Sequence, residues 1–120
     1  MNRTACAALA AFALAATGTS AWAHAKLVSS TPANAATVVA PKQIVLKFNE
    51  TLQAKLSGAE VVMPGMNNMP VAAKASVAKD GLTLIVTPAA PLAPGAYAVK
   101  WHAVTADTHR MQGKVDFTVR

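Results

Sequence analysis

Hydrophobic and polar positions alternate along most of the chain from residue 26 onward. The alternation is clearest at residues 43–49, where Ile44, Leu46 and Phe48 share one face. A period of two residues is typical of a strand with one buried face. Further strands are expected at residues 26–30, 58–63, 71–77, 82–87, 97–103 and 113–119. Turn signals about every 8–12 residues predict an all-β Greek-key sandwich or barrel of about seven strands.

The segments between these strands carry recognisable turn chemistry. Asp80-Gly81 can supply the positive φ of a tight turn, and residues 88–95 hold three prolines that exclude a strand interior. The spacing from Leu92 to Tyr97 is typical of a tyrosine corner, in which the phenol bonds back to the chain. Residues 107–112 are expected to form a loop before the last strand. Pro64 and Gly65 argue against a helix in the loop at residues 63–69.

Residues 1–23 have the pattern of a cleaved secretory signal peptide. A short segment with Arg3 precedes an apolar run at residues 5–16, and Ala21 and Ala23 follow as small residues at a cleavage site. The apolar run is too short to span a bilayer, which takes about 20 residues; a retained membrane anchor is the alternative. Cleavage after Ala23 leaves one domain, residues 24–120, that begins with His24, is exported and is not inserted in the membrane.

Composition narrows the chemistry of that domain. The single cysteine, Cys6, leaves with the signal, so any metal site must use His, Met, carboxylate or backbone ligands. Ten Lys and Arg residues against five Asp and Glu give the domain a net charge of about +5. The basic residues are scattered and form no run, so a nucleic-acid-binding patch is not expected.

A metal site is the candidate function that the residues suggest. A histidine at a free N-terminus offers an imidazole and an α-amine, whose ordinary pKa of about 8 allows it to bind a metal near neutral pH. Asp107 and His109 lie two residues apart, and in an extended segment they would point the same way. Together with His24 they form a set of nitrogen and oxygen donors that suits Cu(II). The alternatives are a solvated terminus and a turn-forming Asp beside an exposed His.

Other residues have less specific patterns. Glu50 could supply a further oxygen or be a surface carboxylate, and His102 is expected on the outer face of its strand. Met63, Met66 and Met69 place three thioethers in seven residues, a soft set that matches Cu(I). These methionines could equally fill gaps on the surface of the sandwich.

These residues together resemble the CopC family of periplasmic copper-binding proteins over residues 24–120. The matching stretches are residues 24–32, 47–52, 63–66, 91–97, 101–104 and 107–109. The resemblance implies a cupredoxin-like Greek-key β-barrel with a Cu(II) site made by His24, Asp107 and His109, with Glu50 close by. It also implies a Cu(I) site in the methionine loop. Here the loop is shorter and Asn67-Asn68 replaces an expected histidine, so we expect only weak Cu(I) binding by Met63, Met66 and Met69.

The sequence therefore predicts a monomeric periplasmic protein that sequesters Cu(II) and passes copper to an inner-membrane transporter. Two other functions remain open at this point. A terminal histidine also holds copper in oxidative enzymes that attack polysaccharides, although a carboxylate such as Asp107 would fill their open coordination position. A metal-free β-sandwich that binds other proteins is the second alternative, and it predicts no stoichiometric copper uptake.

Overall fold

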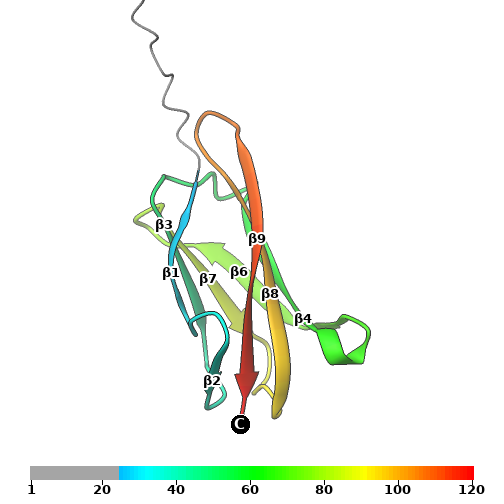
Figure 1. The fold of residues 1–120 in the computed structure, drawn as a ribbon. Coiled ribbons are helices and arrows are strands. Elements are labelled where there is room, and N and C mark those ends of the chain that lie inside the picture. Colours follow the sequence, from blue (N-terminus) through cyan, green and yellow to red (C-terminus); the bar gives the residue numbers. More distant parts are fainter. Residues whose placement is uncertain (1–24) are drawn as a thin grey trace, which may run out of the picture.

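Two β-sheets form the domain, and the computed structural model describes residues 25–120 (Figure 1). The predicted signal peptide and His24 lie outside the described residues. The four-stranded sheet has the order β1 (Leu27–Thr31), β3 (Ile44–Phe48), β7 (Thr83–Pro88) and β6 (Ala73–Val77). The five-stranded sheet has the order β2 (Ala36–Val38), β9 (Arg110–Val119), β8 (Gly95–Val104), β4 (Gly58–Met63) and β5 (Met69–Val71). Neighbouring strands are antiparallel except β2 and β9, which are parallel.

The core lies between the two sheets and is built from the faces that the alternation predicts. Alternate residues of β3, of β8 from Tyr97 and of β9 from Val115 are buried, and these positions make up most of one cluster: Ile44, Leu46, Phe48, Tyr97, Val99, Trp101, Ala103, Val115, Phe117 and Val119. Burying such side chains contributes about 1.5–3 kcal/mol each relative to leaving them exposed. The predicted all-β sandwich is therefore confirmed, and its stability rests on this apolar layer.

Two details of the core connect local sequence to packing. The phenol of Tyr97 donates to the carbonyl of Ala93 at 2.6 Å, which confirms the predicted tyrosine corner. Trp101 packs edge-on against Phe48, with ring centroids 5.1 Å apart. The same indole lies over Gly113, its direct partner across β8 and β9. A Cβ at position 113 would come within 2.6 Å of Trp101 Cζ2, so glycine provides the room for the ring.

Four local predictions were wrong. Ala36–Val38 forms a strand that the sequence did not indicate, and β9 begins at Arg110 rather than at Gly113. The single strand expected at residues 71–77 is two strands in different sheets, because the chain crosses between them at Ala72. A short 3₁₀ helix, η1 (Pro64–Met66), lies in the methionine loop where no helix was expected. The described residues contain nine strands rather than about seven.

Within residues 25–120, no helix is long and apolar enough to cross a bilayer.

Candidate metal site

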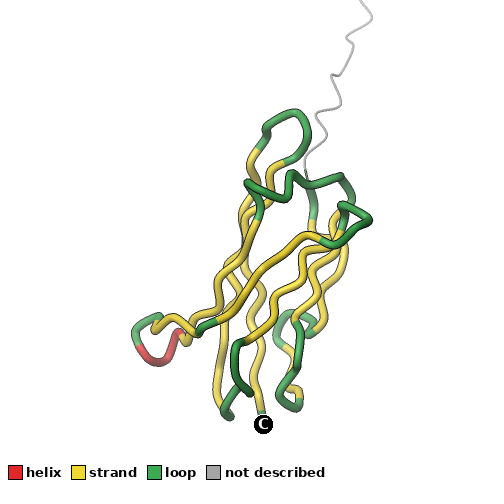
Figure 2. The backbone as a smooth tube through the Cα atoms, turned by 180° about the vertical axis from the view of Figure 1, so that it is seen from behind, coloured by secondary structure: helices red, strands yellow, loops and turns green. Residues whose placement is uncertain are grey.

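Asp107 and His109 belong to the loop between β8 and β9, which lies near the start of β1 at one end of the sandwich (Figures 1 and 2). The start of β1 is held there by Asn49, whose side chain accepts from Lys26 N at 2.7 Å and whose N–H donates to Lys26 O at 3.2 Å. Ala25 is buried, with 1% of its surface exposed. The chain is therefore held in place from Ala25 onward at this end.

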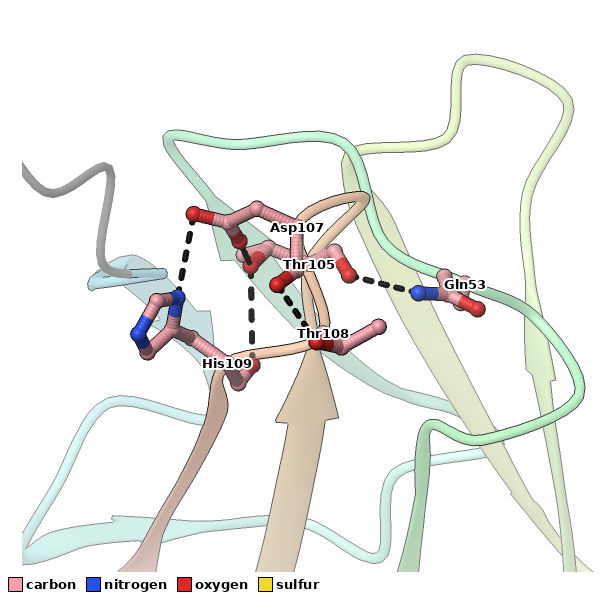
Figure 3. A network of polar contacts seen from close by, with 5 residues as sticks. All are labelled: Gln53, Thr105, Asp107, Thr108 and His109. Carbon is pink, nitrogen blue, oxygen red and sulfur yellow. Dashed lines mark hydrogen bonds and ion pairs between the residues drawn. The ribbon is translucent and has the colours of Figure 1, made fainter.

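Asp107 and His109 come together in a tight turn. Nδ1 of His109 lies 3.0 Å from Oδ2 of Asp107, and the two side chains are 34% and 46% exposed (Figure 3). Thr108, between them, has φ of 69°, and its N–H donates to Thr105 O at 2.9 Å. The two side chains lie together, and their role as metal ligands stays a prediction. The extended geometry expected for this segment was wrong, because a left-handed residue bends the chain between them.

The electrostatics of this pair favour a charged carboxylate. A hydrogen bond from the Thr105 hydroxyl, and then one from His109, hold the pKa of the Asp107 carboxyl below its ordinary value of 3.8. At neutral pH Asp107 is therefore an anion beside an imidazole. In Figure 3 the second ring nitrogen of His109, Nε2, points away from Asp107. The pair thus brings a carboxylate oxygen and an imidazole nitrogen together in the β8–β9 loop.

The other predicted ligands do not join this pair within the described residues. Among residues 25–120, no three His, Cys, Asp or Glu side chains gather where they could hold one metal ion. Glu50 is half-buried, two residues beyond the end of β3, and its contribution remains a prediction. His102 faces outward, as expected, and lines a surface hollow of about 660 Å³ on the outer side of the five-stranded sheet.

The three methionines lie elsewhere, on the hairpin formed by β4, η1 and β5. Met63 and Met69 are direct partners across the two strands, and Met66 belongs to the 3₁₀ helix. Met66 and Met69 are about half exposed, whereas Met63 packs against the core. Both views place this hairpin far from the β8–β9 loop (Figures 1 and 2). A copper ion on these thioethers would therefore be distinct from one at Asp107 and His109.

Sequence reasoning missed two residues that shape the site. Thr105 is 3% exposed, and its hydroxyl donates to Oδ1 of Asp107. The side-chain amide of Gln53 donates to Thr105 O at 2.7 Å. The inward series of Tyr97, Val99, Trp101 and Ala103 has Thr105 as its next member, and a hydroxyl at a buried position needs a partner. That signal could have identified Thr105; Gln53 had none.

Comparisons with known proteins agree with this architecture. The CopC domain model matches residues 27–120. The chain is 48% identical over 103 residues to copper resistance protein C of Pseudomonas syringae pv. tomato, covering 82% of each chain. It is 50% identical over 106 residues to copper resistance protein C of Xanthomonas campestris pv. juglandis, covering 84% of each.

A solved structure shows the same arrangement of strands. The crystal structure of PcoC, a methionine-rich copper resistance protein from Escherichia coli, is 42% identical to this chain, with a TM-score of 0.75. The match covers 82% of this chain and 100% of PcoC. It supports the cupredoxin-like character of the sandwich. The family model, the sequence identities and the shared fold show that this chain belongs to the CopC family.

Proposed function

We propose that the exported protein binds one Cu(II) at the end of the sandwich that carries Asp107 and His109. The α-amine and imidazole of His24 complete the ligand set once the signal peptide has been removed. The observation that carries this proposal is the meeting of the Asp107 carboxylate and the His109 imidazole at the end where β1 begins. The names of the relatives, which are copper resistance proteins, support copper as the ion.

The spacing of the two side chains fits an ion between them. Metal bonds to imidazole nitrogen and carboxylate oxygen are about 2.0–2.2 Å long in well-characterised sites. Two such donors at right angles around one ion are therefore about 3 Å apart. The separation of Asp107 Oδ2 and His109 Nδ1 is 3.0 Å. An ion would take the place of the Nδ1 proton that His109 shares with Asp107, so both atoms would contact it with little rearrangement of the loop.

The proposed role is binding and transport of copper rather than catalysis. The protein sequesters Cu(II) in the periplasm and hands copper to an inner-membrane transporter. The methionine hairpin takes Cu(I) weakly through Met63, Met66 and Met69, because thioether sulfur favours the reduced ion. After reduction of the Cu(II)-loaded protein, X-ray absorption should then show sulfur neighbours around copper. Scattering from nitrogen and oxygen alone would exclude transfer to the methionines.

The decisive experiment is Cu(II) titration of the exported protein followed by electron paramagnetic resonance (EPR). Intact-mass measurement establishes whether the chain begins at His24. A variant with one extra residue before His24 and an Asp107→Asn variant should each lose the one-to-one, nitrogen-rich signal. His102→Ala is the matched control and should bind normally, because that imidazole lies on the outer face of the sheet. An unchanged signal in the extended variant would refute the terminal-histidine site.

A further inference from the structure

Thr105 occupies an unusual position at the edge of the candidate metal site. It is one of two buried polar side chains in residues 25–120, the other being Thr83. Thr105 forms an isolated bridge with Leu52 just beyond the end of β8. Its N–H donates to His109 O at 3.1 Å, and its carbonyl accepts from Gln53 Nε2 at 2.7 Å. The Thr105 backbone is therefore anchored from both sides of the loop (Figure 3).

The hydroxyl of Thr105 links this anchored point to Asp107. It donates to Oδ1 of Asp107, while Oδ2 of the same carboxylate contacts Nδ1 of His109. The hydroxyl has one proton, and its alternative acceptor, His109 O, is 3.5 Å away. One oxygen of the carboxylate is thus held from the protein side and the other faces the imidazole. Without such a donor, a half-exposed Asp side chain keeps several rotamers, and fixing one of them costs conformational entropy.

We propose that Thr105 is a positioning residue for copper, which holds the Asp107 carboxylate in the orientation that coordinates the ion. The inference rests on the proposed function, because it takes Asp107 as a ligand. Partners that hydrogen-bond to metal ligands orient those ligands before the ion arrives, and losing one costs roughly 10–100-fold in metal affinity. Gln53 contributes indirectly, since it holds the Thr105 carbonyl and not the carboxylate.

The test compares Thr105→Val, which keeps the branched shape and removes the donor, with Thr105→Ser, which restores the hydroxyl. Cu(II) affinity is measured by competition with a chelator, and the EPR spectrum is recorded for each loaded variant. We expect the valine variant to bind roughly 10–100-fold more weakly with a broadened, heterogeneous spectrum. The serine variant should recover both properties. Thr105→Ala provides a second hydroxyl-free variant if the valine variant does not fold.

Thr83→Val is a matched control from the same chain. Thr83 is also buried and also donates its hydroxyl to a turn aspartate, Asp80, at 2.9 Å. Its loss should lower the melting temperature without changing copper affinity. Wild-type affinity and spectrum in folded Thr105→Val or Thr105→Ala would overturn the role of Thr105 alone. If wild-type protein takes up no stoichiometric Cu(II), or if Asp107→Asn binds as wild type, the proposed function fails and this inference fails with it.

Discussion

Replacing Gly113 with alanine tests the packing of the core directly. The new Cβ would lie 2.6 Å from Cζ2 and 2.9 Å from Cε2 of Trp101, whereas ordinary contacts of this kind begin at 3.4 Å. The indole is 8% exposed and is held against Phe48, so it cannot move aside freely. Forcing an extra carbon into such a core costs about 1–3 kcal/mol. For a domain of about 100 residues, each kcal/mol lowers the melting temperature by roughly 4–8 °C.

The assay is thermal unfolding followed by tryptophan fluorescence, because Trp101 is the only tryptophan in residues 24–120. We expect Gly113→Ala to melt at a lower temperature and to shift the native emission spectrum. Gly65→Ala is the control, because a Cβ there meets nothing within 4 Å and the expected change is below about 0.5 kcal/mol. A Gly113→Ala protein with wild-type melting temperature and emission would show that the ring does not lie over residue 113.

Two further predictions follow from hydrogen bonds to named groups. Tyr97→Phe removes the hydroxyl that donates to the Ala93 carbonyl, in a side chain that is only 3% exposed. The free energy of unfolding, measured by chemical denaturation, should fall by about 1–2 kcal/mol. An unchanged denaturation midpoint would mean that this hydrogen bond does not stabilise the fold. The pKa of Asp80 is lowered by the N–H of Leu82 and then by the hydroxyl of Thr83, so the folded state binds its proton less readily than the unfolded state. This stability is present above the unfolded pKa, near 3.8, and is lost as the pH falls through the folded value. Asp80→Asn should therefore flatten the fall in melting temperature as the pH drops below about 4. A parallel decline in both proteins would contradict this.

The strands that the sequence predicts well are those with one buried face. In β3, β8 and β9 the alternation extends over five or more residues, so the period of two is unambiguous and the buried side follows from it. The start of β9 was missed for a different reason. Arg110 and Gln112 are polar and follow the loop directly, yet polar residues are also expected on the outer face of a strand in which they alternate with Met111 and Gly113.

The alternation of hydrophobic and polar residues could not predict very short strands or the places where the chain changes sheet. Ala36–Val38 contains three residues, too few to show a period, and it is a strand only because it pairs with the end of β9. Residues 71–77 look continuous locally, yet Val71 pairs with β4 and Ala73 with β7. Which sheet a strand joins depends on its partners, and the local alternation carries no information about them.

The sequence indicated that Asp107 and His109 lie together, but not the residues that support them. Asp107 and His109 were recognised from residue type and separation, and the structure brings them together. Thr108 could not be assigned a left-handed conformation, because β-branched residues rarely adopt positive φ. Gln53 reaches Thr105 across 52 positions of sequence, a contact that only the tertiary fold creates.

The register between β8 and β9 explains why such a short loop can hold the candidate ligands. The two strands pair without interruption from Gly95 and Val119 to Val104 and Arg110. This ladder leaves residues 105–109 as the connection, so the positions of Asp107 and His109 follow from the pairing of the strands. A one-residue slip would turn every side chain of β9 to the opposite face and bury its polar residues. Because the core prevents that slip, the apolar alternation of β8 and β9 also determines where the carboxylate and the imidazole meet.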